Sequence, residues 1–435
     1  MIGATNRDKK GRKPLQADAT PGAAHGAGMS FARLCAVVLL PFGMGYFLSY
    51  LFRAVNAALA PDIVRELDLG ASALGVLTAA YLFAFAAFQP VLGLLLDRFG
   101  PRRVQAALVA VAACGALLFS LGQGALSLAL ARALIGLGFC GGLMSSFKAV
   151  VLWFPPQRVP LASALVSAFG GMGVLVATRP ADMMSQAFGW RAVFVALAAV
   201  SALVAVFIFT AVPERRSADK PAPLGRQIGE IGHIFTDRMF WRVAPLVCTG
   251  AGGYIAVQTL WVGGWLRDVA GLAREDAAWL MLVMAAAFSI GTLIQGVVAD
   301  WFLKRGVGVM ATVLWTYAIF FLSELGLVLE WTAAAPALWI VFGMCGNVAI
   351  LVYPVLSQHF GAALAGRSNT SLNLLMFSTA FAVQALIGVV VEQWPGADAT
   401  HYDARGYQIA FGALLAAQVM SALWYFVLGR RRADA

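Results

Sequence analysis

The fold is decided by the stretch Gly93-Leu-Leu-Leu-Asp97-Arg98-Phe-Gly100-Pro101-Arg102-Arg103, a tight and charged turn between two long apolar runs. A partial copy occurs in the second half of the chain, where the sequence reads Gly296-Val-Val-Ala-Asp300-Trp-Phe-Leu-Lys304-Arg305-Gly306. A charged hairpin that recurs in an apolar chain indicates two related halves, each built from membrane-spanning helices.

The composition favours a membrane protein. Hydrophobic residues make up 61% of the 435 residues and charged residues only 12%, whereas ordinary soluble domains are about 25% charged. The net charge of +10 lies mainly at the chain ends and in short turns, so it indicates membrane topology and not a nucleic-acid partner. All five cysteines lie within apolar runs and no pattern of metal ligands occurs, so we expect neither metal nor cofactor.

Twelve apolar runs are long enough to cross a bilayer, which requires about 20 residues per helix. They are continuously apolar, which excludes a barrel of alternating strands. The predicted spans are residues 33–58, 72–96, 103–122, 125–152, 160–182, 190–212, 242–266, 277–299, 307–329, 333–358, 368–393 and 407–428. We therefore expect an all-α integral membrane protein with two pseudo-symmetric bundles of six helices.

The longest polar interval divides these spans six and six. The expected divisions are a disordered cytoplasmic tail at 1–30, an N-terminal bundle at 31–212, a linker at 213–241, a C-terminal bundle at 242–428 and a cytoplasmic tail at 429–435. Within the linker, Ile228, Ile231, Ile234 and Phe235 recur at helical spacing. This pattern predicts a short helix lying on the membrane surface.

The distribution of basic residues predicts the orientation. With both termini inside the cell, the intracellular segments hold 22 of the 31 Lys and Arg residues, the extracellular loops hold four and the spans hold five. Intracellular loops normally carry this excess of positive charge. We therefore expect both termini in the cytoplasm and a monomer in a bacterial inner membrane.

The twelve spans, their six-plus-six division and the first hairpin resemble the major facilitator superfamily of secondary transporters. The family signature between spans 2 and 3 is matched at Gly93, Leu95, Asp97, Arg98, Gly100 and Arg102. Leu96 and Pro101 depart from it, because Ala and a basic residue are usual there. Arg132-Ala-Leu-Ile-Gly136 and Gly189-Trp190-Arg191 resemble the signatures of spans 4 and 6. The resemblance implies a solute site near mid-membrane, between two bundles that rock to expose it alternately.

The resemblance also implies that the hairpin acts as a gate. In the family, its carboxylate faces the positive N-terminal end of span 11 in the other half. We expect span 11 to open with Ser368-Asn369-Thr370, which suits an N-cap, and Asp97 to latch the outward-open state there. By pseudo-symmetry, Asp300 is expected near Pro160 at the start of span 5. The alternative is a solvated turn that only enforces topology. The expected gating motif comprises Gly93, Asp97, Arg98, Gly100, Arg102, Arg103 and Asp300.

Ionisable residues within the spans are expensive to bury, and most of them here are cations. Arg53 in span 1 and Lys148 in span 4 favour an anionic solute, because carboxylate and phosphate groups match the donors of arginine. Lys148 could instead snorkel to the membrane interface. We expect Arg132, Arg179 and Asp182 to serve structure or coupling, with Arg179 paired to Asp182 or capping a helix.

Neutral residues complete the candidate site. Tyr254, Gln258 and Trp261 are spaced by four and three residues, so they share one face of span 7. That face could contact the solute or simply pack within the bundle. The candidate substrate-binding residues are Arg53, Lys148, Tyr46, Tyr81, Gln258, Trp261, Asn347, Tyr353 and Asn373.

These features favour secondary transport of a small organic or inorganic anion by alternating access, and not enzymatic catalysis. The alternatives are efflux of neutral or amphipathic compounds, with the cations serving structure, and a transporter-like membrane sensor. The chain has no Walker A loop and no hydrolase motif. Only Asp182 and Glu324 offer a carboxylate within the spans for proton coupling, so the coupling mode, the substrate and the direction of transport stay open.

Overall fold

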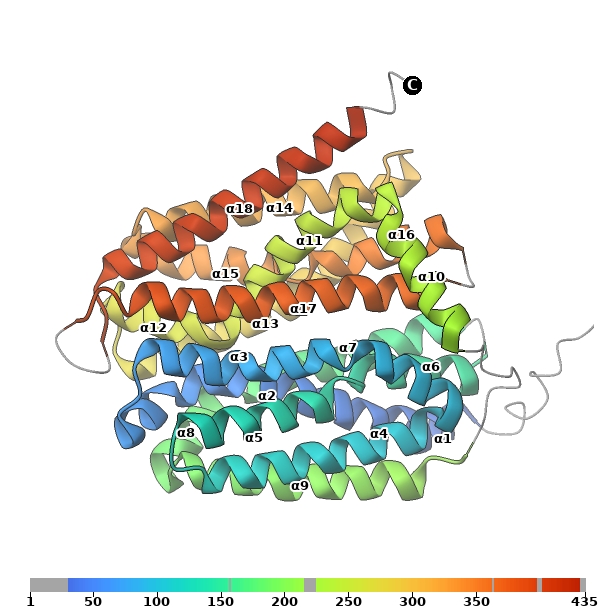
Figure 1. Ribbon diagram of the computed structural model, residues 1–435, viewed down its shortest axis with the longest axis horizontal. Coiled ribbons are helices and arrows are strands. Elements are labelled where there is room, and N and C mark those ends of the chain that lie inside the picture. The colour runs from blue at the N-terminus through green and yellow to red at the C-terminus, as the bar shows by residue number, and fades with distance from the viewer. Residues whose placement is uncertain (1–29, 156–157, 215–223, 362–363, 397–400, 431–435) are drawn as a thin grey trace, which may run out of the picture.

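The computed structural model describes residues 30–155, 158–214, 224–361, 364–396 and 401–430 (Figure 1). The predicted tails at 1–29 and 431–435 lie outside the described residues. The N-terminal half contains α1 (Phe31–Leu34), η1 (Cys35–Leu39), α2 (Leu40–Leu67), α3 (Ala71–Ala87), α4 (Gln89–Leu121), α5 (Ala125–Phe139), α6 (Gly142–Trp153), α7 (Val159–Val176), α8 (Arg179–Phe188) and α9 (Trp190–Ala211). The linker contains α10 (Leu224–Thr236). The C-terminal half contains α11 (Arg238–Ala256), η3 (Val257–Trp261), α12 (Val262–Asp268), α13 (Arg274–Lys304), α14 (Val309–Val328), η4 (Thr332–Ala334), α15 (Ala335–Cys345), η5 (Val348–Leu351), α16 (Val352–Phe360), α17 (Ala365–Val391) and α18 (Ala404–Arg430).

The helical segments confirm the all-α fold and the twelve predicted spans. Among the described residues, ten helices are long and apolar enough to cross a membrane, and the number rises to twelve when each of two bent pairs counts as one span. The bends measure 45° between α3 and the start of α4, and 43° between α7 and α8. Pro90 and Pro180 stand in the first turns after these bends, where a missing backbone N–H is tolerated.

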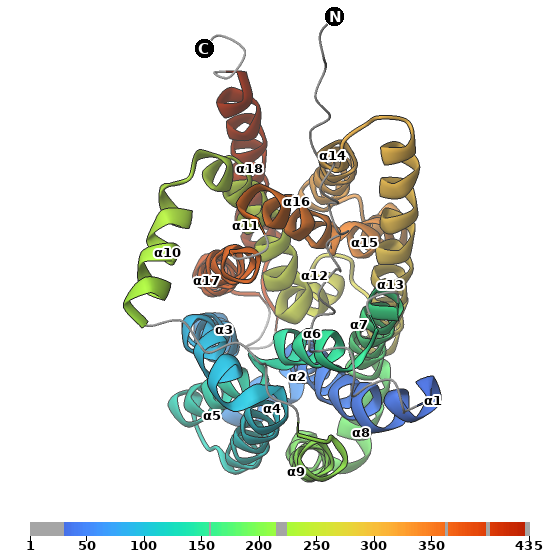
Figure 2. The ribbon, with the colours of Figure 1, turned by 90° about the vertical axis from the view of Figure 1, so that its right-hand side faces the viewer.

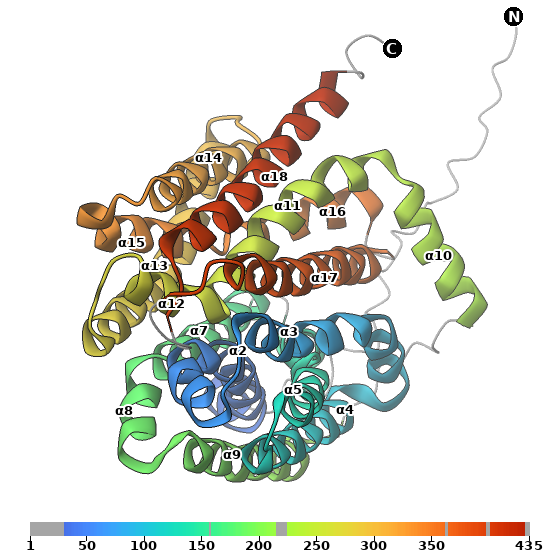
Figure 3. The same cartoon turned by 60° about the vertical axis from the view of Figure 1, so that its left-hand side comes forward.

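The helices assemble into two bundles that face each other. Figures 2 and 3 place α1–α9 in one group and α11–α18 in the other. The bundles meet mainly where α3 packs along α17, where α2 meets η3 and where α7 meets α13. The linker helix α10 lies beside α11 and α17.

The two ends of the molecule are distinguished by their charged residues. The hairpin end carries the turn between Asp97 and Gly100 together with α10, and the ion-pair end carries Asp62, Asp182 and Arg274; Figure 1 shows α10 and α8 at opposite ends. Gly100 has φ 77° and ψ 162°, a conformation that glycine adopts without strain. The expected tight turn is therefore present, and it joins two spans within what is otherwise a continuous helix.

The linker contains the predicted helix. Ile234 of α10 is fully buried, and the ring of Phe235 lies 5.4 Å from that of Phe240 at the start of α11. Glu230 of α10 forms an ion pair with Arg367 near the start of α17. These contacts attach the linker helix to the C-terminal half, and its position on a membrane surface stays a prediction.

The expectation that Ser368-Asn369-Thr370 forms an N-cap is wrong. Gly361, with φ 75°, follows the end of α16, and the next helix starts at Ala365, before these residues. They therefore lie inside the first turns of α17, where their side chains have other partners. The Asn369 amide donates to the Ser357 hydroxyl at 3.2 Å, and the Thr370 hydroxyl donates to a backbone carbonyl at 3.1 Å.

Candidate functional site

Arg53 lies halfway along α2, where the N-terminal half faces the C-terminal half. The residue is 8% exposed, and its guanidinium carbon lies 4.7 Å from the ring centre of Tyr50, 5.3 Å from that of Phe85 and 5.0 Å from that of Phe377. Tyr50 and Phe85 belong to the N-terminal half, whereas Phe377 belongs to α17. Cation–π attraction to the three rings holds the cation between the two halves.

The guanidinium group of Arg53 lacks an acidic partner among the described residues, and its buried Nε atom has no hydrogen-bond acceptor. Removing a cation from water is expensive unless an opposite charge or hydrogen bonds replace the lost hydration. The surrounding rings supply only part of that replacement. The site therefore presents positive charge and N–H donors, and an anion would complete it.

Hydroxyl groups surround this cation on both sides of the interface. The rings of Tyr46 and Tyr50 lie 5.0 Å apart, and the Tyr81 hydroxyl donates to the Ser49 carbonyl at 3.2 Å. On the C-terminal side, the Tyr353 hydroxyl hydrogen-bonds to the amide oxygen of Asn373. Asn373 precedes Phe377 by one turn of α17, and the Phe377 ring contacts Arg53. The structure thus brings together candidates from spans 1, 2, 10 and 11.

Arg132 and Lys148 lie on α5 and α6, the two parts of span 4. Arg132 is 1% exposed in the core of the N-terminal bundle, where its Nη1 atom donates to the Phe52 carbonyl at 2.9 Å. Its guanidinium carbon lies 5.1 Å from the ring centre of Tyr81, on the way to Arg53. Lys148 is half-buried in α6. Arg132 therefore links spans 1, 2 and 4 within one half.

The candidates on span 7 are separated by an irregular turn. Residues 257–261 form a π-helical turn, η3, which carries one extra residue and changes the helix register. Tyr254 stacks on Phe288 at 5.7 Å, whereas the Trp261 indole donates to the Gln384 carbonyl of α17 at 3.1 Å. Gln258 lies within the turn and is 7% exposed. The three residues predicted to share one face thus have different partners.

Asn347 belongs to the packing of the C-terminal bundle. Its amide donates to the Thr292 hydroxyl of α13 at 3.1 Å, at the point where α15 breaks before η5. That contact joins spans 8 and 10 of the same half.

The ion-pair end contains a charged cluster that sequence reasoning missed. The Arg274 guanidinium donates to both oxygens of Asp62, at 2.7 and 2.6 Å, and to Asp182 at 2.7 Å. The Ser185 hydroxyl donates a hydrogen bond to Asp62 at 2.6 Å, and the Gln186 amide donates one to Asp182 at 2.7 Å. Arg274 belongs to the C-terminal half and both acids belong to the N-terminal half, so the cluster closes this end of the interface.

The expected pairing of Arg179 with Asp182 is wrong. Asp182 forms its ion pair with Arg274. Arg179 instead contacts Glu275 across the interface: its guanidinium group lies 3.8 Å from the Glu275 carboxylate and donates to the Glu275 backbone carbonyl at 3.2 Å. The partners Arg274 and Glu275 stand in the first turn of α13 in the other half, and no local spacing predicts such a contact. Asp62 lies in the last turns of α2, because this helix continues past Pro61 and beyond residue 58, the predicted end of span 1.

The hairpin residues contact their own half. The Arg102 Nε atom donates to the Phe209 carbonyl at 2.8 Å, and Arg103 pairs with Glu214 at 2.7 Å, so both attach the turn to the C-terminal end of span 6. The Asp97 side chain lies outside the described part of the structure, and so does that of Pro160. Asp300 pairs with Lys304 of its own helix at 2.5 Å, and both are exposed. Arg98 lies against the adjacent Phe99 ring.

Residues 42–389 match the family described as Major Facilitator Superfamily. The chain is 26% identical to a probable sulfoacetate transporter, SauU, of Cupriavidus necator over 60% of this chain and 64% of that protein. It is 25% identical to a hexuronate transporter of Bacillus subtilis over 62% of this chain and 65% of that protein. The matched regions thus span less than two thirds of these relatives.

A solved structure reproduces the fold. The bacterial homologue of the human lysosomal transporter Spinster, in an inward-facing and occupied conformation, superposes with a TM-score of 0.73. The match covers 92% of this chain and 98% of that chain at 17% sequence identity.

Proposed function

This chain belongs to the Major Facilitator Superfamily, and on that premise we propose that it is a secondary transporter for a small organic anion, with Arg53 as the residue that binds the anionic group. The observation that carries the proposal is the buried guanidinium group between the two halves, which has aromatic neighbours and no acidic partner among the described residues. Two of the relatives are named as transporters of sulfoacetate and of hexuronate, and both of these solutes are anions.

The physical argument concerns charge. A carboxylate or sulfonate accepts two parallel hydrogen bonds from arginine, and such charge-assisted bonds are about twice as strong as neutral ones. In a site with little water, this attraction is screened less than it is at the surface. Tyr353 and Asn373 on the opposite wall then offer polar groups for the rest of the solute. We assign Lys148 a secondary role, as a cation nearer the hairpin end.

The proposed cycle follows from the two ends of the interface. The hairpin end faces the cytoplasm and the ion-pair end faces the outside, in accordance with the basic residues of the chain. The Arg274 cluster keeps the outside closed in the conformation described here. Opening to the outside breaks this cluster, and Asp97 then latches the hairpin end against the start of α17. Solute at Arg53 is thereby exposed to each side in turn.

Transport by reconstituted protein tests the proposal. Uptake of D-glucuronate and of sulfoacetate into proteoliposomes is measured for the wild type, Arg53→Gln and Arg53→Lys. Arg53→Gln is expected to reduce uptake about 10- to 100-fold, because one charge-assisted contact is lost. Arg53→Lys is expected to retain part of the activity, since a point charge replaces a bidentate donor. Arg405→Gln, which changes an exposed arginine at the start of α18, is the matched control.

Two results would count against this function. Wild-type uptake of neutral solutes with no competition from anions favours the efflux alternative. Ligand-induced thermal stabilisation without any uptake favours a sensor, since binding alone raises the apparent stability.

A further inference from the structure

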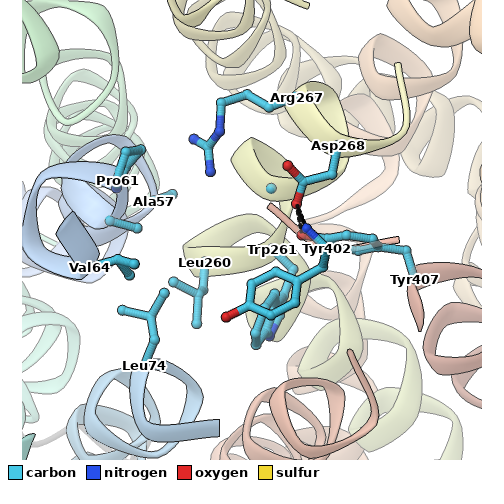
Figure 4. Close-up of a pocket in the computed structure, with 12 residues that line it drawn as sticks. Ala57, Pro61, Val64, Leu74, Leu260, Trp261, Arg267, Asp268, Tyr402 and Tyr407 are labelled. Carbon is cyan, nitrogen blue, oxygen red and sulfur yellow. Dashed lines mark hydrogen bonds between the residues drawn. The ribbon is translucent and has the colours of Figure 1, made fainter. Parts of the chain in front are cut away.

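A recess with a mainly apolar lining and two charged side chains lies between the halves at the ion-pair end (Figure 4). Its walls come from α2 and α3 of the N-terminal half, and from η3, α12, the segment before α18 and α18 itself of the C-terminal half. The empty space between these walls, with open solvent included, amounts to about 430 Å³. The recess is therefore built by both halves, as the Arg53 site is.

The recess stands in line with Arg53 along α2. Ala57, Ala60 and Val64 line it, and they follow Arg53 by four, seven and eleven residues, so all four share one face of the helix. At 1.5 Å per residue, the recess extends from about 6 Å to about 16 Å beyond Arg53. A solute that moves between Arg53 and the ion-pair end along this face passes through it.

Two charged side chains face the recess with unused hydrogen-bonding capacity. Figure 4 shows the Arg267 guanidinium extending towards the α2 wall at Pro61, and no hydrogen bond or ion pair joins it to another described residue. The Asp268 Oδ2 atom accepts from the Tyr407 hydroxyl at 2.7 Å and from the Tyr402 backbone N–H at 3.4 Å, whereas the buried Oδ1 atom has no partner. The recess thus offers one donor group and one acceptor atom side by side.

The neighbouring charges are already occupied. Arg267 also lines an adjoining recess that contains Asp182 and Arg274. There Arg274 binds Asp182 at 2.7 Å and Asp62 at 2.7 and 2.6 Å, so neither carboxylate neutralises Arg267 directly. An anionic group that enters the first recess would find Arg267 as its nearest cation without an ion-pair partner.

We propose that this recess is a second solute-binding station for a hydroxylated organic acid passing between Arg53 and the ion-pair end. The carboxylate of the solute binds Arg267, a hydroxyl group donates to Oδ1 of Asp268, and the carbon skeleton lies against Trp261. The station rests on the proposed function and narrows its substrate class. An acid without a hydroxyl group leaves the buried Oδ1 atom unpaired, and unpaired polar atoms are the strongest source of discrimination in such sites.

The test compares the two ends of the reconstituted full-length protein. The KM for D-glucuronate is measured from the ion-pair end and from the hairpin end, in vesicles of opposite orientation. Arg267→Gln is expected to raise the KM at the ion-pair end about fivefold or more and to leave the KM at the hairpin end within about twofold. Arg405→Gln, at the same end and exposed, is expected to change neither value.

A second variant tests the hydroxyl contact. Malate and succinate are dianions that differ by one hydroxyl group, and both are used as competitors at the ion-pair end. In the wild type, malate is expected to inhibit glucuronate uptake more strongly than succinate. Asp268→Leu is expected to remove that difference, because leucine supplies neither an acceptor nor a donor to the hydroxyl group.

The outcomes separate the station from the transport function. Unchanged KM values in Arg267→Gln overturn the station and leave Arg53 as the binding residue. Equal increases at both ends overturn it as well, because they reveal an effect on the Arg53 site or on the fold. Equal inhibition by malate and succinate in the wild type overturns the hydroxyl contact. Wild-type protein that takes up no organic anion overturns the proposed function, and the station falls with it.

Discussion

The two ends of the interface between the halves are held in different ways. At the ion-pair end, Arg274 of one half binds Asp62 and Asp182 of the other, and the Asp182 side chain is only 2% exposed. At the hairpin end, Arg102, Arg103 and Asp300 bind partners within their own halves. The ion pairs described between the halves are therefore gathered at one end, which closes that end.

The space around three glycines differs between the two ends in the same way. A Cβ atom at Gly388 would lie 2.7 Å from the Ala71 carbonyl oxygen, across the interface at the ion-pair end. A Cβ atom at Gly93 or Gly296, which begin the two hairpin segments, would meet no heavy atom within 4 Å. The backbones of the halves touch at one end, whereas the hairpin glycines face space at the other. A transporter that works by alternating access must open the packed end and close the open end. Substitutions at each end can test these two changes separately.

The largest effect is expected from Arg274→Gln. This substitution leaves the buried Asp182 carboxylate without its cation, and breaking such a pair costs about 3–5 kcal/mol. The closed ion-pair end should therefore open more often. A cysteine placed at Ala58, in the recess beside Arg274, should then react at least about tenfold faster with a membrane-impermeant thiol reagent added at that end.

The control for this experiment carries Arg405→Gln in the same cysteine background, from which the five native cysteines have been removed. An equal labelling rate in Arg274→Gln and the control would show that the cluster does not hold the end closed.

A matched pair of glycine substitutions should sharpen the comparison. Gly388→Ala forces a methyl group against a backbone carbonyl, and such overpacking costs about 1–3 kcal/mol. Gly93→Ala places the same group in open space and should keep or slightly raise stability, since Ala favours helix over Gly by about 1 kcal/mol. Thermal unfolding in detergent measures both. Equal losses of stability would contradict the difference between the ends.

A smaller effect is expected at Asp237, which begins α11 at the hairpin end. Its carboxylate accepts from the Phe240 N–H at 2.8 Å and lies 3.1 Å from the His359 ring. Burial alone raises the pKa of Asp237, but the hydrogen bonds with His359 and Phe240 outweigh it and hold the pKa below the ordinary value of 3.8. The stabilisation is thus present above that value and is lost as the pH falls through the lowered pKa.

Asp237→Ala removes this N-cap and should cost about 1 kcal/mol at neutral pH. The difference in unfolding temperature between the wild type and the variant should narrow below about pH 4, because protonation of Asp237 removes the same interaction from the wild type. The measurement is the unfolding temperature as a function of pH, with His359→Gln to separate the ion pair from the cap. A constant gap across the whole range would exclude the carboxylate as the source.

The smallest effect is expected from Arg103→Gln. The ion pair with Glu214 is 45% and 35% exposed, and exposed pairs contribute about 0–1 kcal/mol. The loss in the free energy of unfolding of the variant should stay within that range, and its uptake rate should remain close to that of the wild type. A loss as large as that of Gly388→Ala would indicate that the hairpin end is held as firmly as the ion-pair end.

Much of the fold could be predicted from local sequence, and some of the candidate site could be as well. Arg53 stood out because a cation is rare within an apolar run. Its neighbour Tyr50 comes from the same span and Phe85 from the next one, but Phe377 comes from the other half. The expected pair Arg179–Asp182 was wrong because residues of the other half bind both side chains. The expected cap at Ser368-Asn369-Thr370 was wrong because α17 starts earlier, at Ala365.

The sequence by itself determined the membrane-spanning helices, their division into six and six and the charged hairpin. These are local properties, because a lipid environment requires each apolar segment to satisfy its own backbone hydrogen bonds as a helix. Only the tertiary structure decided which end of the interface is closed, and that Arg274 is the residue that closes it. Arg274 and Asp62 lie 212 residues apart, so their contact depends on how two finished bundles dock. A pairing of that kind leaves no periodic signal in the sequence.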